Sequence, residues 1–459
     1  MTALMMQPIW SSAMSEHVIA SGLRKLGPDG NVSHEEALGG QAIRENAVVY
    51  DSLITSYFRA SRRGQRQDTE LMLEKARAVL RDLQKARENY HMIDDEFQLP
   101  VLVARYLADS MVEATRKRAF LLDSSDGRGS RLSLLLLEMA VVATWTRPYV
   151  EDPRPAKLVG FPKRDATHWR SASWRDSDAG YAGGRFAMDA NAIWAPRALH
   201  SIAVILASLD SLGLAAHSLT PGLDSTTLGE YRRNPASLGR AIEIWRAARR
   251  HFQVALPPAL AERRVKARLA ALPAADRRYW QKMFASRAAT TDSVFFLALS
   301  LDTDGTPIPV VNTDPATGLF LREFTDSASL RSTIDPFVHA YPLGLFVDSL
   351  GPLVANDAYA PRAVWERFRA DAYHSPRVVW GREVNLLLLG LANAAGPVAR
   401  DALNRTLAAV EASKLGYNEL WSYRIARGRL LPVRYGTSSD VQLWNTTDRA
   451  VEFVLSGLK

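Results

Sequence analysis

The sequence of 459 residues contains no cysteine. This absence excludes disulfide bonds, thiolate metal sites and a cysteine nucleophile. The nine histidines show no His-x-His or His-x-x-x-His spacing, and no acidic run has the calcium-loop pattern. The glycine-rich motifs GxGxxG and GxxxxGK[ST] are missing, as is the nucleophile motif GxSxG. We therefore expect neither a metal ion nor a cofactor.

Long apolar runs and compact basic runs are also lacking. The most apolar window, 132–144, is short and contains Glu138, so no membrane span is expected. No signal peptide is visible in the first residues, and a periplasmic or secreted location with a trimmed signal stays as open as a cytoplasmic one. The net charge is +8, but the arginines are spread along helical patterns, as at Arg246, Arg249 and Arg250. A nucleic-acid partner is therefore not expected.

Helical periodicity dominates what the sequence does contain. Ser33 and Glu36 form a capping-box pattern before the first expected helix. Without a linker rich in proline or serine, about twelve helices favour one closed helical toroid over two separate bundles. Residues 1–459 would then form a single domain. Helices are expected over 33–58, 68–90, 98–116, 130–144, 189–212, 234–252, 258–271, 276–288, 329–350, 361–373, 382–394, 399–415 and 441–458.

One stretch departs from this helical pattern. Residues 293–301 and 307–311 are rich in β-branched and aromatic side chains, and the turn sequence Asp302-Thr303-Asp304-Gly305 separates them. This arrangement is typical of a β-hairpin. We expect a hairpin near 293–312, within a small β insertion that extends to about residue 325.

The segment 173–194 is the most informative part of the chain. It combines carboxylates, tryptophans and glycines directly before an apolar helix. Aromatic rings and carboxylates suit a carbohydrate site, because sugar C–H faces stack on indole, carboxylates accept hydroxyl protons and a carboxylic acid can protonate a glycosidic oxygen. A solvated turn with an aspartate cap is the simpler alternative. The candidate residues of this segment are Trp174, Arg175, Asp176, Asp178, Arg185, Asp189, Asn191 and Trp194.

Three further loops carry similar residues. Asp94, Asp95 and Glu96 are consecutive carboxylates, which also fit the acidic first turn of a helix. Two later loops place carboxylates between aromatic residues, where a helix start or a helix cap is the alternative. The candidates there are Trp380, Arg382 and Glu383, then Glu419 and Trp421, then Asp440. His200 and His339 lie in apolar helices and fit core positions.

The pattern resembles a known family. Ser173-Trp-Arg-Asp176 followed by Met188-Asp-Ala-Asn-Ala-Ile-Trp194 is similar to segments of six-hairpin glycosidases of the glycogen-debranching and processing α-glucosidase type. The loops at 94–96, 380 and 419–422 come in the order in which those enzymes use loops at the mouth of an (α/α)6 barrel. The likeness runs from about residue 35 to 455 and is specific at 174–194.

The resemblance implies an all-α (α/α)6 toroid and a glycoside hydrolase, acting by an inverting mechanism on an oligosaccharide or glycoside. Asp176 matches the general acid. Glu419 is the choice for the base and Asp440 the reserve, since Val433 follows Pro432 where debranching enzymes often have a glutamate. An inverting pair is separated by roughly 6.5–9.5 Å. The substrate-binding residues would be Asp95, Glu96, Trp174, Arg175, Asp178, Arg185, Asp189, Asn191, Trp380, Glu383 and Trp421.

Other classes stay open on the sequence alone. A polysaccharide lyase on a similar toroid would use residues such as Tyr373 and His374 and would neutralise a uronate. A sugar epimerase would need paired histidines, and a glycan-binding protein would keep the tryptophans yet tolerate Asp176→Asn. The sugar, the linkage, exo or endo action and the oligomeric state are not indicated.

Overall fold

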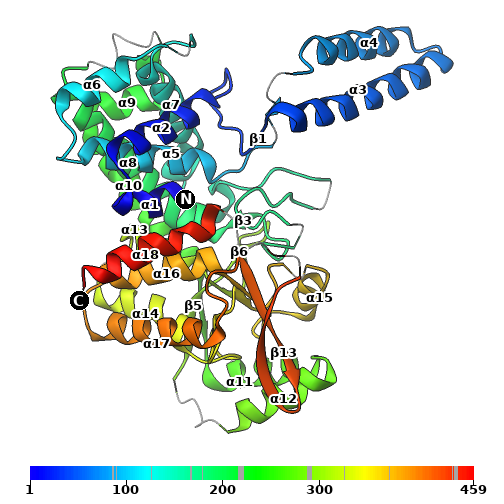
Figure 1. The fold of residues 1–459 in the computed structure, drawn as a ribbon, viewed down its shortest axis with the longest axis vertical. Helices are drawn as coiled ribbons and strands as arrows, with labels where there is room; N and C mark the ends of the chain where they lie inside the picture. The colour runs from blue at the N-terminus through cyan, green and yellow to red at the C-terminus, as the bar shows by residue number, and fades with distance from the viewer. Residues whose placement is uncertain are drawn as a thin grey trace.

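A computed structural model gives the arrangement of the chain (Figure 1). The protein is mainly α-helical, with short strands placed between the helices. The structure describes residues 1–84, 87–88, 90–125, 127–165, 168–177, 179–214, 222–286, 292–324, 326–371, 373–436, 438 and 443–458.

The helices of the first half gather in one part of the molecule, and a long helical hairpin projects from it (Figure 1). The hairpin consists of α3 (Gly39–Arg62) and α4 (Arg66–Arg81). The other helices here are α1 (Thr2–Met6), α2 (Ser12–Arg24), α5 (Asp95–Ala108), α6 (Ala114–Leu122), α7 (Arg131–Glu151), α8 (Ala195–Ser211), α9 (Thr227–Arg233) and α10 (Pro235–Arg246).

The second half carries the remaining helices and most of the strands. Helix α18 returns to pack against α1 and α16, so the two ends of the chain share one core. The helices are α11 (Pro258–Ala270), α12 (Ala274–Ala285), α13 (Pro315–Leu321), α14 (Ser327–Val338), α15 (Arg362–Ala370), α16 (Gly381–Asn393), α17 (Pro397–Ser413) and α18 (Thr447–Ser456).

The strands form small antiparallel sheets. The three-stranded sheets are β3 (Phe186–Ala187), β6 (Ser300–Leu301) and β7 (Pro307–Ile308), and β12 (Val378–Trp380), β13 (Leu420–Ala426) and β14 (Arg429–Arg434). The pairs are β1 (Glu36–Ala37) with β2 (Arg87–Glu88), β4 (Gln253–Leu256) with β5 (Val294–Leu297), β8 (Val311–Asn312) with β11 (Ala355–Asn356), and β9 (Phe346–Val347) with β10 (Gly351–Pro352).

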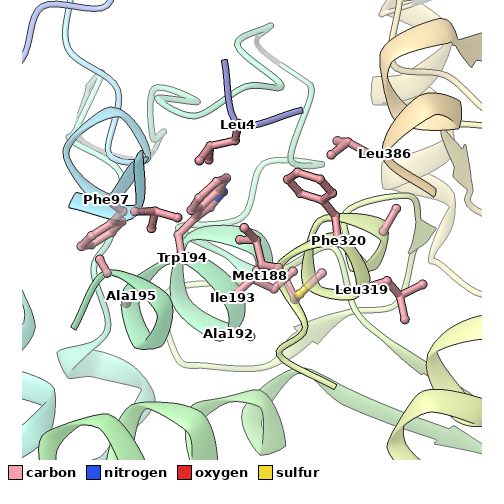
Figure 2. Packing of buried hydrophobic residues seen from close by; sticks show 14 of the residues in the cluster. Leu4, Phe97, Met188, Ala192, Ile193, Trp194, Ala195, Leu319, Phe320 and Leu386 are labelled. Carbon is pink, nitrogen blue, oxygen red and sulfur yellow. The ribbon is translucent and has the colours of Figure 1, made fainter. Parts of the chain in front are cut away.

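The core joins both halves through helices that are buried on nearly every side. Such helices read as continuous apolar runs, as α5, α7 and α16 do. Figure 2 shows Trp194 at the junction, with Phe97 of α5 on one side and Phe320 of α13 and Leu386 of α16 on the other. Trp194 ends a π-helical turn, η3 (Ala190–Trp194), that leads directly into α8.

Most of the expected helices are present, usually with shifted ends. The expected helix 329–350 ends at Val338, before Pro342, which has no N–H to continue it. The hairpin near 293–312 is confirmed, with Ser300 paired to Ile308 and Leu301 to Pro307. Helices α1, α2, α9 and α13, most of α6 and the β12–β13–β14 sheet were not predicted.

The capping box at Ser33 is wrong. Glu36 lies in β1, where it pairs with Glu88 of β2, and α3 begins only at Gly39. The hydroxyl of Ser33 is buried and caps no helix. A two-residue strand that needs a partner 52 positions later leaves no local signal, so the local capping pattern was misleading.

One helical stretch bears on the expectation that the chain has no membrane span. Ala190–Ser211 is long and apolar enough to cross a membrane by length and composition, with a mean hydropathy of 1.5. Within the protein, 67% of this window is buried. Core helices meet the same criterion, so the stretch is weak support for a membrane span.

Candidate active site

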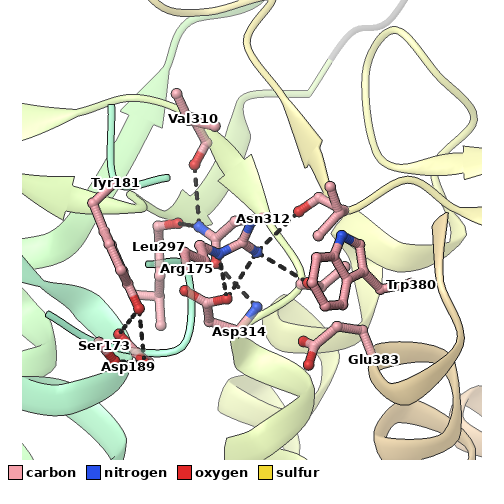
Figure 3. A network of polar contacts seen from close by, with 12 residues as sticks. Ser173, Arg175, Tyr181, Asp189, Leu297, Val310, Asn312, Asp314, Trp380 and Glu383 are labelled. Atoms are coloured by element: carbon pink, nitrogen blue, oxygen red, sulfur yellow. Dashed lines mark hydrogen bonds and ion pairs between the residues drawn. The ribbon is translucent and has the colours of Figure 1, made fainter. Parts of the chain in front are cut away.

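A buried arginine holds the loop that carries the candidate acid (Figure 3). Nη2 of Arg175 donates to Oδ1 of Asp314 at 2.8 Å, to the hydroxyl of Thr313 at 3.1 Å and to the carbonyl of Val354 at 3.0 Å. Its Nε also donates to Asp314, at 3.0 Å. Neither side chain of the ion pair is exposed. Arg175 is therefore a fully buried anchor of the loop, and the predicted role as a ligand contact is not supported.

Asp176, the next residue, lies on the exposed side of the loop. The hydroxyl of Tyr90 donates to Oδ2 of Asp176 at 3.4 Å. Burial, followed by the charge of Asp176, raises the pKa of Tyr90 to about 12. Tyr90 is thus a proton donor beside this carboxylate at neutral pH.

Glu419 directly precedes β13, and only 6% of the residue is exposed. Its carbonyl accepts a hydrogen bond from the N–H of Gly381 at 2.9 Å, which fixes the backbone at the start of α16. The hydroxyl of Tyr373 donates to Oε1 of Glu419 at 3.1 Å. Burial and then the charge of Glu419, with a smaller contribution from Asp176, raise the pKa of Tyr373. Tyr373 therefore lies within electrostatic reach of both proposed catalytic carboxylates.

Aromatic rings surround these carboxylates. Trp174 meets Trp380 edge to face, with centroids 5.6 Å apart, and the guanidinium of Arg382 lies 4.6 Å from the Trp174 ring centroid. Trp380 is nearly buried, whereas Trp174 is half-buried and Tyr373 is 36% exposed. Tyr435 and Trp444 extend the group at ring distances of 6.0 Å from Tyr373 and 6.3 Å from Trp380. Tyr373 is thus the most exposed ring of the group. The Trp174 ring also contacts a second guanidinium, that of Arg175, at 4.3 Å from its centroid.

His374 supports this aromatic group from behind. Its ring is fully buried and stacks on Trp380 at an interplanar angle of 9°. Nδ1 lies 2.8 Å from the hydroxyl of Ser177 and 3.2 Å from Oδ2 of Asp371. Ser177 also donates to Asp371. The loop that follows Asp176 is thereby tied to the loop that carries Tyr373.

Several buried carboxyl groups lie beneath the aromatic rings. Asp189 accepts hydrogen bonds from Ser173 at 3.1 Å and from Tyr181 at 3.2 Å, and burial raises its pKa well above the ordinary range. Burial also raises the pKa of Asp94, to about 6. Glu383 is buried and accepts from Nη2 of Arg382 at 2.7 Å. None of the three is open to a sugar hydroxyl in this structure.

Other predicted binding residues have structural contacts. Asn191 bonds the backbone of Val159 and Ala187, and Trp421 is fully buried with its N–H on the carbonyl of Leu350. The structure therefore does not support a ligand-binding role for Asn191 or for Trp421. Residue type shows neither which way a loop side chain faces nor how deeply it is buried, so the sequence did not separate these residues from exposed ones.

The remaining predicted residues lie around the site or outside the description. Arg185 is half-buried over the rings of Trp169 and Phe186. Asp95 pairs with Nδ1 of His34 at 2.9 Å. Asp178 and Asp440 lie outside the described residues, so their predicted roles stay predictions.

Glu96 is the most isolated of the predicted acids. It is fully buried, and its only hydrogen bond in the described part of the chain comes from the N–H of Val32, at 3.1 Å. Burial raises the pKa of Glu96 to about 8, and burial followed by the charge of Glu96 raises the pKa of Glu138 well above its ordinary range. Both are buried core acids.

The comparisons with protein families and with curated proteins gave no match. Among the described residues, no cluster of histidine and carboxylate side chains is suited to hold a metal ion.

Replacing Arg175 with methionine should lower the free energy of unfolding by about 3–5 kcal/mol, because Asp314 would be left buried and unpaired. Urea unfolding followed by tryptophan fluorescence measures the effect. Arg331→Met, at an exposed arginine, is the matched control. Equal unfolding midpoints for the two variants would contradict the anchoring role.

Replacing Glu96 with glutamine should change how stability depends on pH. The folded pKa of about 8 exceeds the ordinary 4.5, so between these values only the unfolded state gives up its proton, and wild-type stability falls as pH rises. The glutamine variant does not lose stability in this way. Its free energy of unfolding should exceed that of wild type by a few kcal/mol at pH 8, but by little near pH 4.5. Glu70→Gln, at an exposed site, serves as control. A difference that does not vary with pH would disprove the assignment.

Proposed function

We propose that the protein is a glycoside hydrolase that cleaves glycosidic bonds by inversion. The observation that carries the proposal is the hydrogen bond from Tyr373 to Glu419, with Asp176 within electrostatic reach of the same tyrosine. Tyr373 donates to Glu419, and its pKa responds to the charges of both carboxylates. A glycosidase needs two such carboxylates on either side of the scissile bond.

In the proposed reaction, Asp176 donates a proton to the leaving oxygen while Glu419 accepts one from the attacking water. The C–O bond to the leaving group breaks as the water oxygen bonds to the anomeric carbon on the opposite face. Tyr90 and Tyr373 hydrogen-bond the two carboxyl groups and orient them. Tyr373, the most exposed ring of the aromatic group, supplies a stacking surface for a sugar ring.

The proposal includes the toroidal arrangement that the resemblance implies. Successive buried helices pack side by side, with α8 against α5 and α10, and α16 against α13, α17 and α18. The loops between them carry the candidate site. An (α/α)6 barrel places its active site on such loops at one end of the helices.

The raised pKa of Tyr373 favours a hydrolase over a lyase. A tyrosine that serves as the base of a lyase must be accessible as phenolate, which requires a lowered pKa. The pKa of Tyr373 is raised, because its phenolate would be half-buried beside Glu419. His374 is fully buried behind Trp380, so it does not reach a substrate either.

Replacing Asp176 with asparagine should lower hydrolysis by at least about 100-fold, because the general acid is lost. Wild type and variant are screened on α- and β-linked oligosaccharides by product chromatography, and the anomer first released is read by NMR. Asp401→Asn, at an exposed aspartate, is the control. Equal cleavage by the Asp176 variant would refute the assignment, and a retained anomer would refute inversion.

Replacing Tyr373 with phenylalanine keeps the ring but removes the hydrogen bond to Glu419. We expect kcat to fall roughly tenfold with little change in KM, because the lost interaction orients the base and binds no substrate. Tyr417→Phe, at an exposed tyrosine in the same region, is the matched control. A change confined to KM would instead assign Tyr373 to substrate binding alone.

A further inference from the structure

A group of arginines gathers where the first and second halves of the chain meet. Arg105 lies on α5, Arg197 on α8 and Arg322 directly after α13. The charges of Arg197 and Arg322 both act on Arg105, so these guanidinium groups lie within electrostatic reach of it. The guanidinium of Arg105 lies 5.0 Å from the ring centroid of Phe320, which Figure 2 shows at the junction of the two halves. We call Arg105, Arg197 and Arg322 the arginine cluster.

Arg105 is half-buried and has no carboxylate partner among the described residues. Its Nη1 donates to the carbonyl of Leu4 at 3.3 Å and to Oε1 of Gln7 at 3.4 Å. Both acceptors are neutral, and both distances exceed the roughly 2.7–2.9 Å of a charge-assisted hydrogen bond. Burial, followed by the charges of Arg197 and Arg322, lowers the pKa of Arg105 to about 10. The surroundings of this guanidinium therefore disfavour its charge.

Arg197 is only partly neutralised. Its Nη1 donates to Oε1 of Glu323 at 3.3 Å, while its buried Nε has no hydrogen-bond partner in the described part of the chain. Glu323 also lies 4.0 Å from Nε of Arg246, an arginine that has a closer partner in the exposed Glu243, at 2.7 Å. Glu323 is thus shared between two arginines. Within the described ranges, the other two members of the cluster have no carboxylate partner.

Arg322 has a backbone conformation that an arginine rarely adopts. Its φ of 60° lies in the left-handed region, at the C-cap of α13. Glycine is the residue that favours this position at a helix end, because it has no Cβ. The side chain is exposed, and its Nη2 donates to Oδ1 of Asn393 at 3.3 Å. Strain at a cation that has only a neutral partner points to a functional role for its side chain.

Interaction with helix ends is the simpler explanation for two of these arginines. Arg105 is in the last turn of α5 and Arg322 follows α13, where the partial negative charge of a helix favours a cation. Their hydrogen bonds, however, go to other segments: Leu4 and Gln7 for Arg105, and Asn393 at the end of α16 for Arg322. A helix end also attracts each cation separately and does not offset the repulsion among the three. The convergence of the cluster therefore needs another explanation.

The arginine cluster is separate from the candidate active site. Helices α5 and α13 begin beside that site, at Asp95 and next to Asp314, and both end at the cluster. Arg105 lies ten positions after Asp95, which corresponds to about 15 Å along the helix. Because Arg322 is exposed, the cluster can be reached from solvent at this far end. A ligand of the cluster would therefore bind without entering the candidate active site.

We propose that the arginine cluster binds a phosphate group. Guanidinium groups match phosphate oxygens in geometry and charge, and they often bind them through two parallel N–H bonds. A phosphate group carries about −1.5 to −2 charges at neutral pH, so it offsets the excess positive charge better than a singly charged carboxylate does. The bound group would join α5 and α8 of the first half to the end of α13 in the second half.

Equilibrium dialysis of the full chain against radiolabelled inorganic phosphate, at constant ionic strength in chloride, measures this binding. We expect one saturable site per chain, with acetate competing poorly. Competition by glucose 6-phosphate identifies the source of the group: stronger competition than by unlabelled phosphate indicates a phosphorylated small molecule, and equal competition indicates free phosphate. Glucose itself should not compete. Absence of saturable phosphate binding would overturn the proposal.

Arg322→Gly separates phosphate binding from folding. Glycine suits the left-handed backbone, so without phosphate this variant should unfold at the wild-type temperature or above it, as followed by circular dichroism. Its affinity for phosphate should nevertheless fall at least about 10-fold, and Arg105→Gln should have a similar effect. Arg362→Gln, at an exposed arginine paired with Glu366, is the matched control and should bind phosphate as wild type does. Unchanged phosphate affinity in the Arg105 and Arg322 variants would show that the cluster is not the binding site.

Discussion

The buried ion pair between Arg175 and Asp314 is the constraint on which the candidate site depends. Asp314 lies next to the start of α13, and Arg175 lies in a loop 139 positions earlier, so one guanidinium joins two distant segments. Nη1 of Arg175 and Oδ2 of Asp314 have no hydrogen-bond partner in the described part of the chain, which makes the pair a costly solution for stability alone. The ion pair instead positions the loop. Because the side chain of Arg175 is held in the protein interior, Trp174 packs against Trp380 and Asp176 lies at the surface beside Tyr90.

The same region holds more buried carboxyl groups than buried cations. Asp94, Asp189, Asp314 and Glu383 are all buried, while Arg175 and Arg382 are the arginines in contact with them. Burial raises the pKa of Asp94, of Asp189 and of Asp314, so part of this group keeps its protons where a surface aspartate would not. The raised pKa values thereby reduce the negative charge that is buried beneath the site.

The sequence predicted the parts of the fold that local patterns determine. Helices such as α11, α16 and α17 follow apolar periodicity and were expected close to their observed ends. The β12–β13–β14 sheet was missed because β12 is three residues long and its pairing to β13 spans more than 40 positions. In the candidate site, the sequence singled out the segment 173–194, but Arg175 and Asp189, expected to contact a ligand, are buried. Tyr90, Tyr373 and His374 lay in the motifs, yet their role depends on contacts between loops that no local spacing reveals.

The hairpin and the candidate site share one structural element. The chain enters the hairpin through β1 and leaves it through β2, and Tyr90 lies two positions after the end of β2. The carbonyl of Tyr90 accepts from the N–H of His34 at 2.8 Å, the two rings stack 5.2 Å apart, and the Tyr90 hydroxyl reaches Asp176. Tyr90 therefore links the base of the hairpin to the proposed acid through its backbone carbonyl, its ring and its hydroxyl.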